Sequence, residues 1–299
     1  MTYLELFTSQ TNVFSGIQKS FEEAKYVIFG VPFDGTSTYR TGARFGPNAI
    51  RQASLNIETY SFRSDMDIED LALYDSGDLH VSSEAKETND MTRCVVEDIL
   101  ASGKMPVALG GEHTITFGIA QGLGKKVKET AFVSFDAHLD LREEFLGSTY
   151  SHTTFMQMIN EQLKPAKIFE VGTRSTCKDE IAYAKQAGVE FFTSQQIIKQ
   201  GSEAVLELLK EKLAPYENVY LTVDMDVLDP AFAPAVQNPE AEGITTTALM
   251  DIACGLSDKR VVGFDVLEIA PIYDQGVSAV VAAKVVFEML CQLEKARTK

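Results

Sequence analysis

The chain has few cysteines, no long apolar run and little positive charge. Its four cysteines, Cys94, Cys177, Cys254 and Cys291, lie far apart without paired spacing, which excludes a disulfide framework and a zinc ribbon. No stretch approaches the ~18 consecutive apolar residues of a membrane-spanning helix. We therefore expect reduced thiols in a cytoplasmic protein.

Basic residues are too few and too dispersed for a polyanion-binding protein. The 27 Lys and Arg stand against 43 Asp and Glu, and the net charge is −16. Sequence-independent binding to nucleic acid needs basic patches, and the densest basic cluster is Lys125, Lys126 and Lys128. We expect neither a nucleic-acid nor a membrane partner. An acidic surface attracts cationic ligands. The net negative charge is equally explained by a role in keeping the protein soluble.

No Pro-, Gly- or Ser-rich linker divides the 299 residues, of which 45% are hydrophobic and 23% charged, an ordinary globular composition. The motifs described below extend from His113 to Glu268, so a division would split one site. We expect a single domain over residues 1–299.

Eight short runs rich in β-branched and aromatic residues predict strands, several of them apolar throughout, as in strands covered on both faces. They lie at residues 26–31, 71–74, 106–109, 130–135, 167–171, 189–192, 219–223 and 261–266. Helical spacing of apolar residues follows at 89–102, 202–213 and 277–293. This alternation predicts an α/β fold with a mostly parallel eight-stranded sheet and helices on both sides.

One polar, glycine-containing segment, residues 32–56, interrupts the alternation. Gly46 and Pro47 predict a loop that leads into a helix at residues 48–53. A polar loop after the first strand is either the rim of a pocket or an ordinary connection.

The strongest chemical signal is the sequence Ser-Phe-Asp-Ala-His-Leu-Asp at residues 134–140. Asp136, His138 and Asp140 are metal-ligand residue types at alternate positions directly after a predicted strand. Alternate residues of an extended chain point to one face, and ligands of open α/β sheets bind beyond the carboxyl ends of the strands. We expect these side chains to converge there.

A second acidic cluster has the same layout. Asp224 and Asp226 follow the run at residues 219–223 with the same spacing. Four carboxylates brought together would repel one another strongly, and two divalent cations would balance them. Either cluster alone is also explained by salt bridges or strand-end turns, but two matching clusters favour a metal site.

Three further residues follow strands or lie in a nearby loop. His113, in Gly-Gly-Glu-His after residues 106–109, joins the set as another strand-end ligand type, although alone it reads as a core histidine. Glu268, after residues 261–266, is a candidate metal ligand or partner of a cationic substrate group; a surface carboxylate is the alternative. His152 is a candidate acid, base or proton shuttle, or an ordinary loop histidine.

The ligand types favour a borderline-hard divalent ion. Two histidines with several carboxylates and no cysteine argue against structural zinc and iron–sulfur centres. Mn²⁺ is the first choice, and Zn²⁺, Fe²⁺ and Co²⁺ stay open.

Together these motifs resemble the ureohydrolases, the arginase and agmatinase superfamily. The matching pieces lie at residues 42–47, 75–78, 110–114, 134–142, 150–152, 224–230 and 265–271. The resemblance implies a three-layer α/β/α fold with a binuclear manganese site and a homotrimer or homohexamer. The implied ligands are His113 and Asp140 for one metal, His138 and Asp226 for the other, and Asp136 and Asp224 bridging both.

The resemblance also implies the catalytic residues. Glu268 matches the glutamate that faces the substrate guanidinium, His152 matches the histidine near the leaving group, and Asp140 is a candidate to pass a proton to the leaving amine. The implied substrate is a small cationic guanidino compound.

Within the superfamily the chain looks most like agmatinase, which implies hydrolysis of agmatine to putrescine and urea in polyamine biosynthesis. The agmatinase-like stretches are Asp140-Leu141-Arg142 and Tyr150-Ser151-His152. One departure is Val236-Gln237-Asn238-Pro239, where many relatives have Thr-Gly-Thr-Pro near the substrate.

That departure leaves the guanidino substrate open. Arginase, guanidinobutyrase and formiminoglutamase activities remain alternatives, as does a catalytically inactive metal-binding homologue. The related deacetylases use one zinc and a His-His pair, which this chain lacks.

Overall fold

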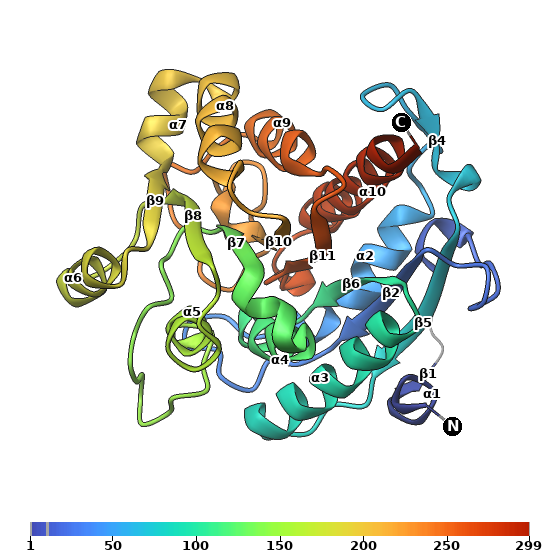
Figure 1. The fold of residues 1–299 in the computed structure, drawn as a ribbon, viewed down its shortest axis with the longest axis horizontal. Helices are drawn as coiled ribbons and strands as arrows, with labels where there is room; N and C mark the ends of the chain where they lie inside the picture. Colours follow the sequence, from blue (N-terminus) through green and yellow to red (C-terminus); the bar gives the residue numbers. More distant parts are fainter. Residues whose placement is uncertain (1, 10–11, 299) are drawn as a thin grey trace.

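The computed structural model describes residues 2–9 and 12–298; Met1 and Lys299, the limits of the expected domain, lie outside these residues. Its centre is a nine-stranded sheet with the order β1-β5-β2-β6-β11-β10-β7-β8-β9 (Figure 1). The strands are β1 (Thr8–Ser9), β2 (Tyr26–Val31), β5 (Leu73–Leu79), β6 (Met105–Gly110), β7 (Thr130–Phe135), β8 (Lys167–Thr173), β9 (Glu190–Thr193), β10 (Asn218–Asp224) and β11 (Val261–Leu267).

The mostly parallel sheet is confirmed, but the expected number of eight strands is wrong. The ninth strand, β1, has two residues and pairs antiparallel with Leu79 and Asp78 at the edge of the sheet. A two-residue strand is too short to show a period-2 pattern, and its pairing is with residues about seventy positions away. No local signal could have predicted it.

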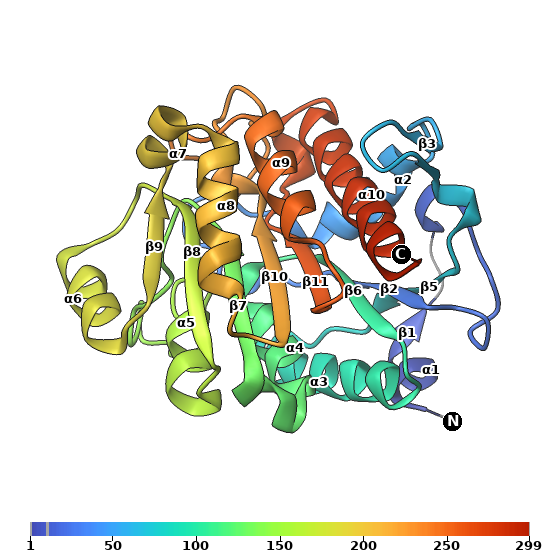
Figure 2. The same ribbon diagram turned by 45° about the horizontal axis from the view of Figure 1, so that its top comes forward.

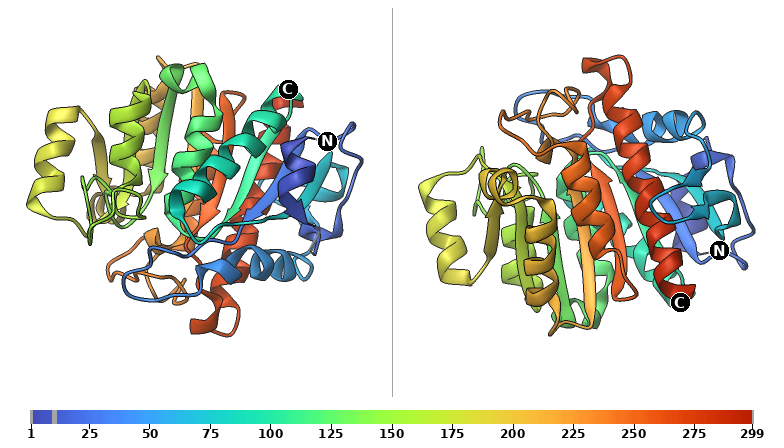
Figure 3. Two further views of the ribbon diagram at one scale, coloured as in Figure 1. Left: turned by 90° about the horizontal axis from the view of Figure 1, so that it is seen from below. Right: turned by 90° about the horizontal axis from the view of Figure 1, so that it is seen from above.

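Helices cover both faces of the sheet, as expected, in three layers. They are α1 (Tyr3–Phe7), α2 (Gly46–Ser54), α3 (Ala85–Ala101), α4 (Thr116–Gly122), α5 (Phe155–Met158), α6 (Lys178–Ala187), α7 (Ser194–Gln200), α8 (Ser202–Leu213), α9 (Thr246–Leu256) and α10 (Val277–Thr298). One face carries α2 and α7–α10, and the other carries α1 and α3–α5 (Figure 2). Figure 3 shows each face in turn, with the long α10 crossing one of them.

The side chains of a central strand enter two separate cores. In β7, Ala131, Val133 and Phe135 pack in the core that includes residues of α8, α9 and α10. Phe132, between them, packs in the core that includes residues of α3 and α4. Burial on both faces is why the strand is apolar without alternation.

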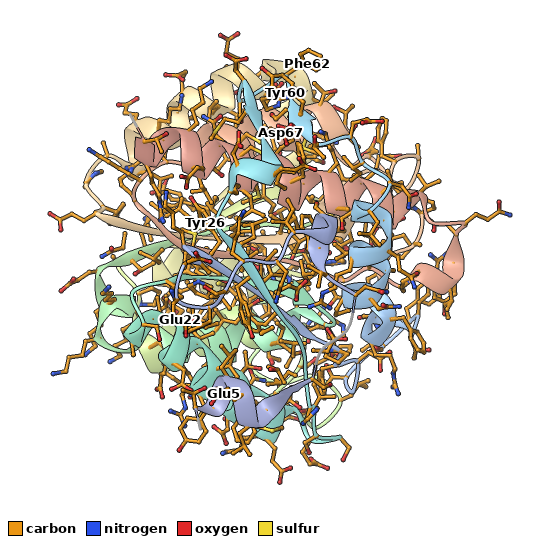
Figure 4. The ribbon with its side chains drawn as sticks, turned by 90° about the vertical axis from the view of Figure 1, so that its right-hand side faces the viewer. Glu5, Glu22, Tyr26, Tyr60, Phe62 and Asp67 are labelled. Carbon is orange, nitrogen blue, oxygen red and sulfur yellow. The ribbon has the colours of Figure 1, made fainter. Side chains whose placement is uncertain are left out.

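Away from the carboxyl edge, the β3–β4 hairpin (Tyr60–Ser61, Met66–Asp67) lies at the periphery (Figure 4). Its Phe62 is 94% exposed, whereas Tyr26 is buried inside the molecule and donates to Glu294 of α10 at 2.9 Å. None of the helices in the described ranges has both the length and the apolar character needed to span a bilayer.

Candidate metal centre

The carboxyl ends of four adjacent parallel strands carry the predicted site residues. The strands β6, β11, β10 and β7 are neighbours in the sheet (Figure 1). His113 follows β6, Glu268 follows β11, Asp224 ends β10 and Asp136 follows β7. Because parallel strands end at the same edge, residues more than 150 positions apart meet there.

Six of the ligand-type side chains named from the sequence lie together at this edge. The nitrogen Nδ1 of His113 lies 3.1 Å from Asp136 and 3.3 Å from Asp224. Possible ligand atoms lie within 4.8 Å of one another in two groups that share one carboxylate. The groups are His113, Asp136 and Asp140, and Asp136, His138 and Asp226.

Backbone amides hold the carboxylates and leave a second oxygen of each free. The amide of His138 donates to Oδ1 of Asp136 at 2.6 Å, and the amide of Asp226 donates to Oδ1 of Asp224 at 2.7 Å. The amide of Ala137 donates to Oδ1 of Asp226 at 3.1 Å. The remaining oxygens, Oδ2, face the imidazoles of His113 and His138, where a cation would bind.

The tautomer of His113 follows from two residues that the sequence reading missed, Thr222 and Asp265. The hydroxyl of Thr222 donates to the buried carboxylate of Asp265, so its oxygen accepts from Nε2–H of His113 at 2.8 Å. In the neutral imidazole the lone pair is therefore on Nδ1, which has no hydrogen-bond partner within the described part of the chain. An unpartnered imidazole nitrogen among carboxylates fits a metal ligand.

The charges of the centre are unbalanced within the protein. Burial and the neighbouring Asp136 raise the pKa of Asp140 well above its usual value, and burial with Asp226 does the same for Asp224. Burial alone would lower the pKa of His113, but the carboxylate of Asp136 outweighs it and raises the pKa to about 9. Protons thus take up the negative charge that divalent cations would otherwise neutralise. Oxygen and imidazole donors suit such cations.

A further missed residue, Arg174, holds the chain segment that carries Asp226. Its guanidinium donates to the carbonyls of Asp226 at 2.7 Å, Val227 at 3.1 Å and Leu228 at 3.2 Å. It also donates to the carbonyl of Glu240 at 2.8 Å. One partly buried cation therefore joins the loop after β8 to two loops around the centre.

The backbone is strained at two of the predicted catalytic residues. Asp140 and Glu268 have φ values of 50° and 68°, in the left-handed region that non-glycine residues rarely adopt. Such strain costs on the order of 1–3 kcal/mol and clusters at functional sites. No sequence pattern indicates it, because the local residue types are compatible with ordinary extended chain.

Glu268 lies beside the metal-ligand residues and has one free oxygen. Its Oε1 accepts from the amide of His113 at 2.6 Å, and its own amide donates to Gly111 at 2.8 Å. A Cβ on Gly111 would lie 2.2 Å from the carbonyl of Phe33, so this close approach requires glycine. The buried Oε2 has no partner among residues 2–9 and 12–298. Burial and Asp224 raise the pKa of this carboxyl group well above its usual value.

A pocket of about 180 Å³ opens over the centre. Its lining includes Asp140, Glu268 and His152, so the loop histidine does reach the site. Asn238, from the stretch that departs from the family pattern, also lines it. The adjacent Gln237 is buried and donates its amide to the carbonyl of Arg40 at 2.9 Å, which joins that stretch to the loop after β2.

The missed residues share a recognisable signal. Thr222, Asp265 and the buried Glu112 are polar residues within or next to apolar runs, where they cost free energy unless they are hydrogen-bonded. The pairing of Thr222 with Asp265 across β10 and β11 needs the strand order, which the sequence does not specify.

Comparisons with known proteins agree with this geometry. The Arginase family model matches residues 24–291. An agmatinase from Bacillus anthracis is 40% identical over 284 residues, 93% of this chain and 95% of that protein. An N(1)-aminopropylagmatine ureohydrolase from Thermococcus kodakarensis is 34% identical and covers 92% of each chain.

A solved structure shares the fold throughout. The crystal structure of agmatine ureohydrolase of Thermoplasma volcanium superposes with a TM-score of 0.90 at 34% identity, over 97% of each chain. With the family model matching most of the sequence, these likenesses show that the chain belongs to the arginase family.

Proposed function

We propose that this protein is a ureohydrolase that cleaves agmatine to putrescine and urea. The observation that carries the proposal is the convergence of four carboxylates and two imidazoles at one sheet edge, with the free Oε2 of Glu268 in the same pocket. The agmatinases among the relatives, at up to 40% identity over nearly the whole chain, support agmatine as the substrate.

The residues of the centre suit two divalent cations, proposed to be Mn²⁺. His113 and Asp140 would hold one, His138 and Asp226 the other, and Asp136 and Asp224 would be shared. Bound cations at such a site supply the charge that makes water a nucleophile near neutral pH. Their identity and number are testable by metal analysis.

The chain's own residues would orient the substrate and move protons. The free oxygen of Glu268 is placed to accept charge-assisted hydrogen bonds from a guanidinium. Asp140 would pass a proton to the leaving amine, and His152 would relay protons at the pocket. The buried, acidic surroundings favour a cationic substrate over a neutral one.

The chain is proposed to act as one ureohydrolase domain in a cytoplasmic homotrimer or homohexamer. Exposed apolar residues, among them Ile272, Val277 and Val280, offer surface for contacts between copies. The four cysteines form no disulfide in the structure, in keeping with a reducing compartment. Light scattering after size exclusion measures the number of copies.

The deciding experiment is a urea assay on the Mn²⁺-loaded protein with agmatine, arginine, 4-guanidinobutyrate and N(1)-aminopropylagmatine. We expect the highest kcat/KM with agmatine. Higher kcat/KM with another compound would move the substrate assignment to that compound. No urea from any of them, at full metal occupancy, would identify a metal-binding protein without ureohydrolase activity.

A further inference from the structure

The carboxylate of Glu112 is fully buried and lies beside the imidazole of His152. Its Oε2 accepts from the backbone amide of Thr36 at 2.9 Å. Its Oε1 accepts from the hydroxyl of Thr36 and from the hydroxyl of Thr114 at 3.2 Å, and lies 3.3 Å from Nδ1 of His152. Three donors, one at Oε2 and two at Oε1, thus make both oxygens of this carboxylate acceptors.

These contacts determine which imidazole nitrogen carries the proton. The hydroxyl of Thr36 has one proton and donates it to Glu112. The same hydroxyl oxygen lies 3.3 Å from Nδ1 of His152, and it can therefore only accept a hydrogen bond from that nitrogen. Two acceptors, Thr36 and Glu112, thus converge on Nδ1. In the neutral imidazole Nδ1 is then protonated, and Nε2 has the lone pair.

Nε2 lies on the pocket side. It is 3.3 Å from the hydroxyl of Thr38, which lines the pocket together with His152 and Glu268. A nitrogen that exchanges protons with a substrate must face the pocket with its lone pair free in the neutral state.

We propose that Glu112 is the positioning residue of His152, holding the neutral imidazole as the Nδ1–H tautomer so that Nε2 is the nitrogen that gains and loses a proton at the pocket. The inference rests on the proposed function for the catalytic use of His152, whereas the tautomer is independent of it. Carboxylates that set imidazole tautomers act in this way in other enzymes, where the wrong tautomer costs about 10⁴-fold in kcat.

The same contacts assign a role to the loop after β2. Thr36 and Thr38 both belong to residues 32–56, the segment that interrupts the strand–helix alternation. Thr36 joins Glu112 to His152, and Thr38 contacts the other nitrogen of the same ring. Of the two readings of this segment, the pocket rim is the one that fits.

The test is the Glu112→Gln variant, whose amide has one acceptor oxygen in place of two. The backbone N–H of Thr36 can only donate, so the amide oxygen of Gln should stay oriented toward Thr36. The NH₂ group then faces His152 and donates to Nδ1, which inverts the tautomer to Nε2–H.

Imidazole ¹⁵N chemical shifts measure the tautomer directly, in full-length protein loaded with diamagnetic Zn²⁺ at alkaline pH. The chain has only four histidines, and a His152→Asn variant identifies the His152 signals by their loss. We expect Nδ1–H in the wild type and Nε2–H in Glu112→Gln. An Nε2–H wild type, or the same tautomer in both proteins, would overturn the proposal.

Kinetics of the Mn²⁺-loaded proteins give the second readout. Glu112→Gln should lower kcat on agmatine by on the order of 10²- to 10⁴-fold, with KM and metal content unchanged. The matched control is Glu288→Gln, a buried glutamate of α10 that accepts from Ser61 and pairs with Lys284 far from the pocket; it should keep wild-type kcat and tautomer. Parallel loss of metal and kcat would make Glu112 a folding residue. A wild type that makes no urea, together with an inverted tautomer in Glu112→Gln, would refute the proposed function while leaving the positioning intact.

Discussion

Two regions of this protein bury acidic clusters, and they differ in where the positive charge comes from. In the first, Arg51 is fully buried and pairs with Asp75 at 2.8 Å and with Asp78 at 2.5 Å. In the second, the metal centre, the carboxylates are accompanied by the imidazoles of His113 and His138.

The difference separates a part that maintains the fold from a part that binds. Asp75 is satisfied by both Arg51 contacts and by the amide of Phe14 at 2.9 Å, so this cluster is complete within the chain. At the centre, carboxyl groups retain protons, and His113 and Glu268 each keep an unpartnered buried atom among the residues described. A buried charge without a partner is costly, so the centre is built for an external cation.

The largest expected effect comes from removing a carboxylate shared by both proposed cation sites. Asp136→Ala should bring metal content close to zero and reduce urea production on the order of 10⁴-fold, because the charge that activates water is lost. Atomic emission on the purified variant, with the urea assay, measures both. Wild-type metal content in this variant would break the proposed ligand set.

Removing the cation of the first cluster should destabilise the protein without changing the centre. Arg51→Met leaves the buried Asp75 and the partly buried Asp78 without their cation, and we expect a loss of about 3–5 kcal/mol in the free energy of unfolding. Urea denaturation measures it. Metal bound per folded molecule should stay the same. Adding Asp75→Asn and Asp78→Asn to Arg51→Met should restore part of the stability.

A smaller effect is expected from substituting Arg174, whose guanidinium holds a loop of the metal centre in place. Arg174→Lys has three donors in place of a planar guanidinium, so the segment carrying Asp226 should be held less firmly. We expect a 10- to 100-fold loss in affinity, about the range for residues that orient ligands, at one of two sites in calorimetric titration with Mn²⁺. Arg260→Lys, which loses a carbonyl contact to Leu213 far from the centre, is the control. Equal weakening in both variants would contradict the assignment.

The smallest expected effect is on the pH dependence of stability. It distinguishes the two clusters because protons bound at the metal centre, and not at the Arg51 cluster, are expected to cause it. In metal-free protein the pKa of His113 rises to about 9, so its contribution to stability is complete below about pH 6.5 and is lost as the pH rises through 9. The raised pKa values of Asp140 and Asp224 act in the same direction.

Thermal unfolding between pH 6 and pH 9 tests this sign. Metal-free protein should lose about 1.4 kcal/mol between pH 7 and pH 8 for each excess proton held by the folded state. Mn²⁺ should flatten or reverse the slope, because cations displace those protons. Arg51→Met should keep the wild-type slope, and a slope that Mn²⁺ leaves unchanged would show that the protons lie elsewhere.

Strand prediction from sequence was accurate where both faces are apolar and weaker where charge intervenes. The run predicted at residues 130–135 is β7 itself, and the helix at 202–213 is α8. The run predicted at 71–74 is β5, Leu73–Leu79, which continues through Asp75 and Asp78. Polar residues read as the end of a strand, but Arg51, from α2, neutralises them and lets the strand extend.

The ligand-type residues of the centre were predictable because of local patterns: five stand at alternate positions at or just after the end of an apolar strand, and His113 follows another such strand closely. The residues that position them were not. Thr222 contacts His113 and Asp265, and Glu112 contacts Thr36 and His152, in hydrogen bonds between segments from 40 to more than 100 residues apart.

The sequence by itself determined the order of strands and helices and which residue types stand at the strand ends, because period and composition are local properties of the chain. Tertiary structure alone decided which strands are neighbours, which nitrogen of His113 and of His152 is free, and that the loop after β2 lines the pocket. Those outcomes depend on hydrogen bonds and buried charges between distant segments, whose free energies exist only once the sheet has assembled.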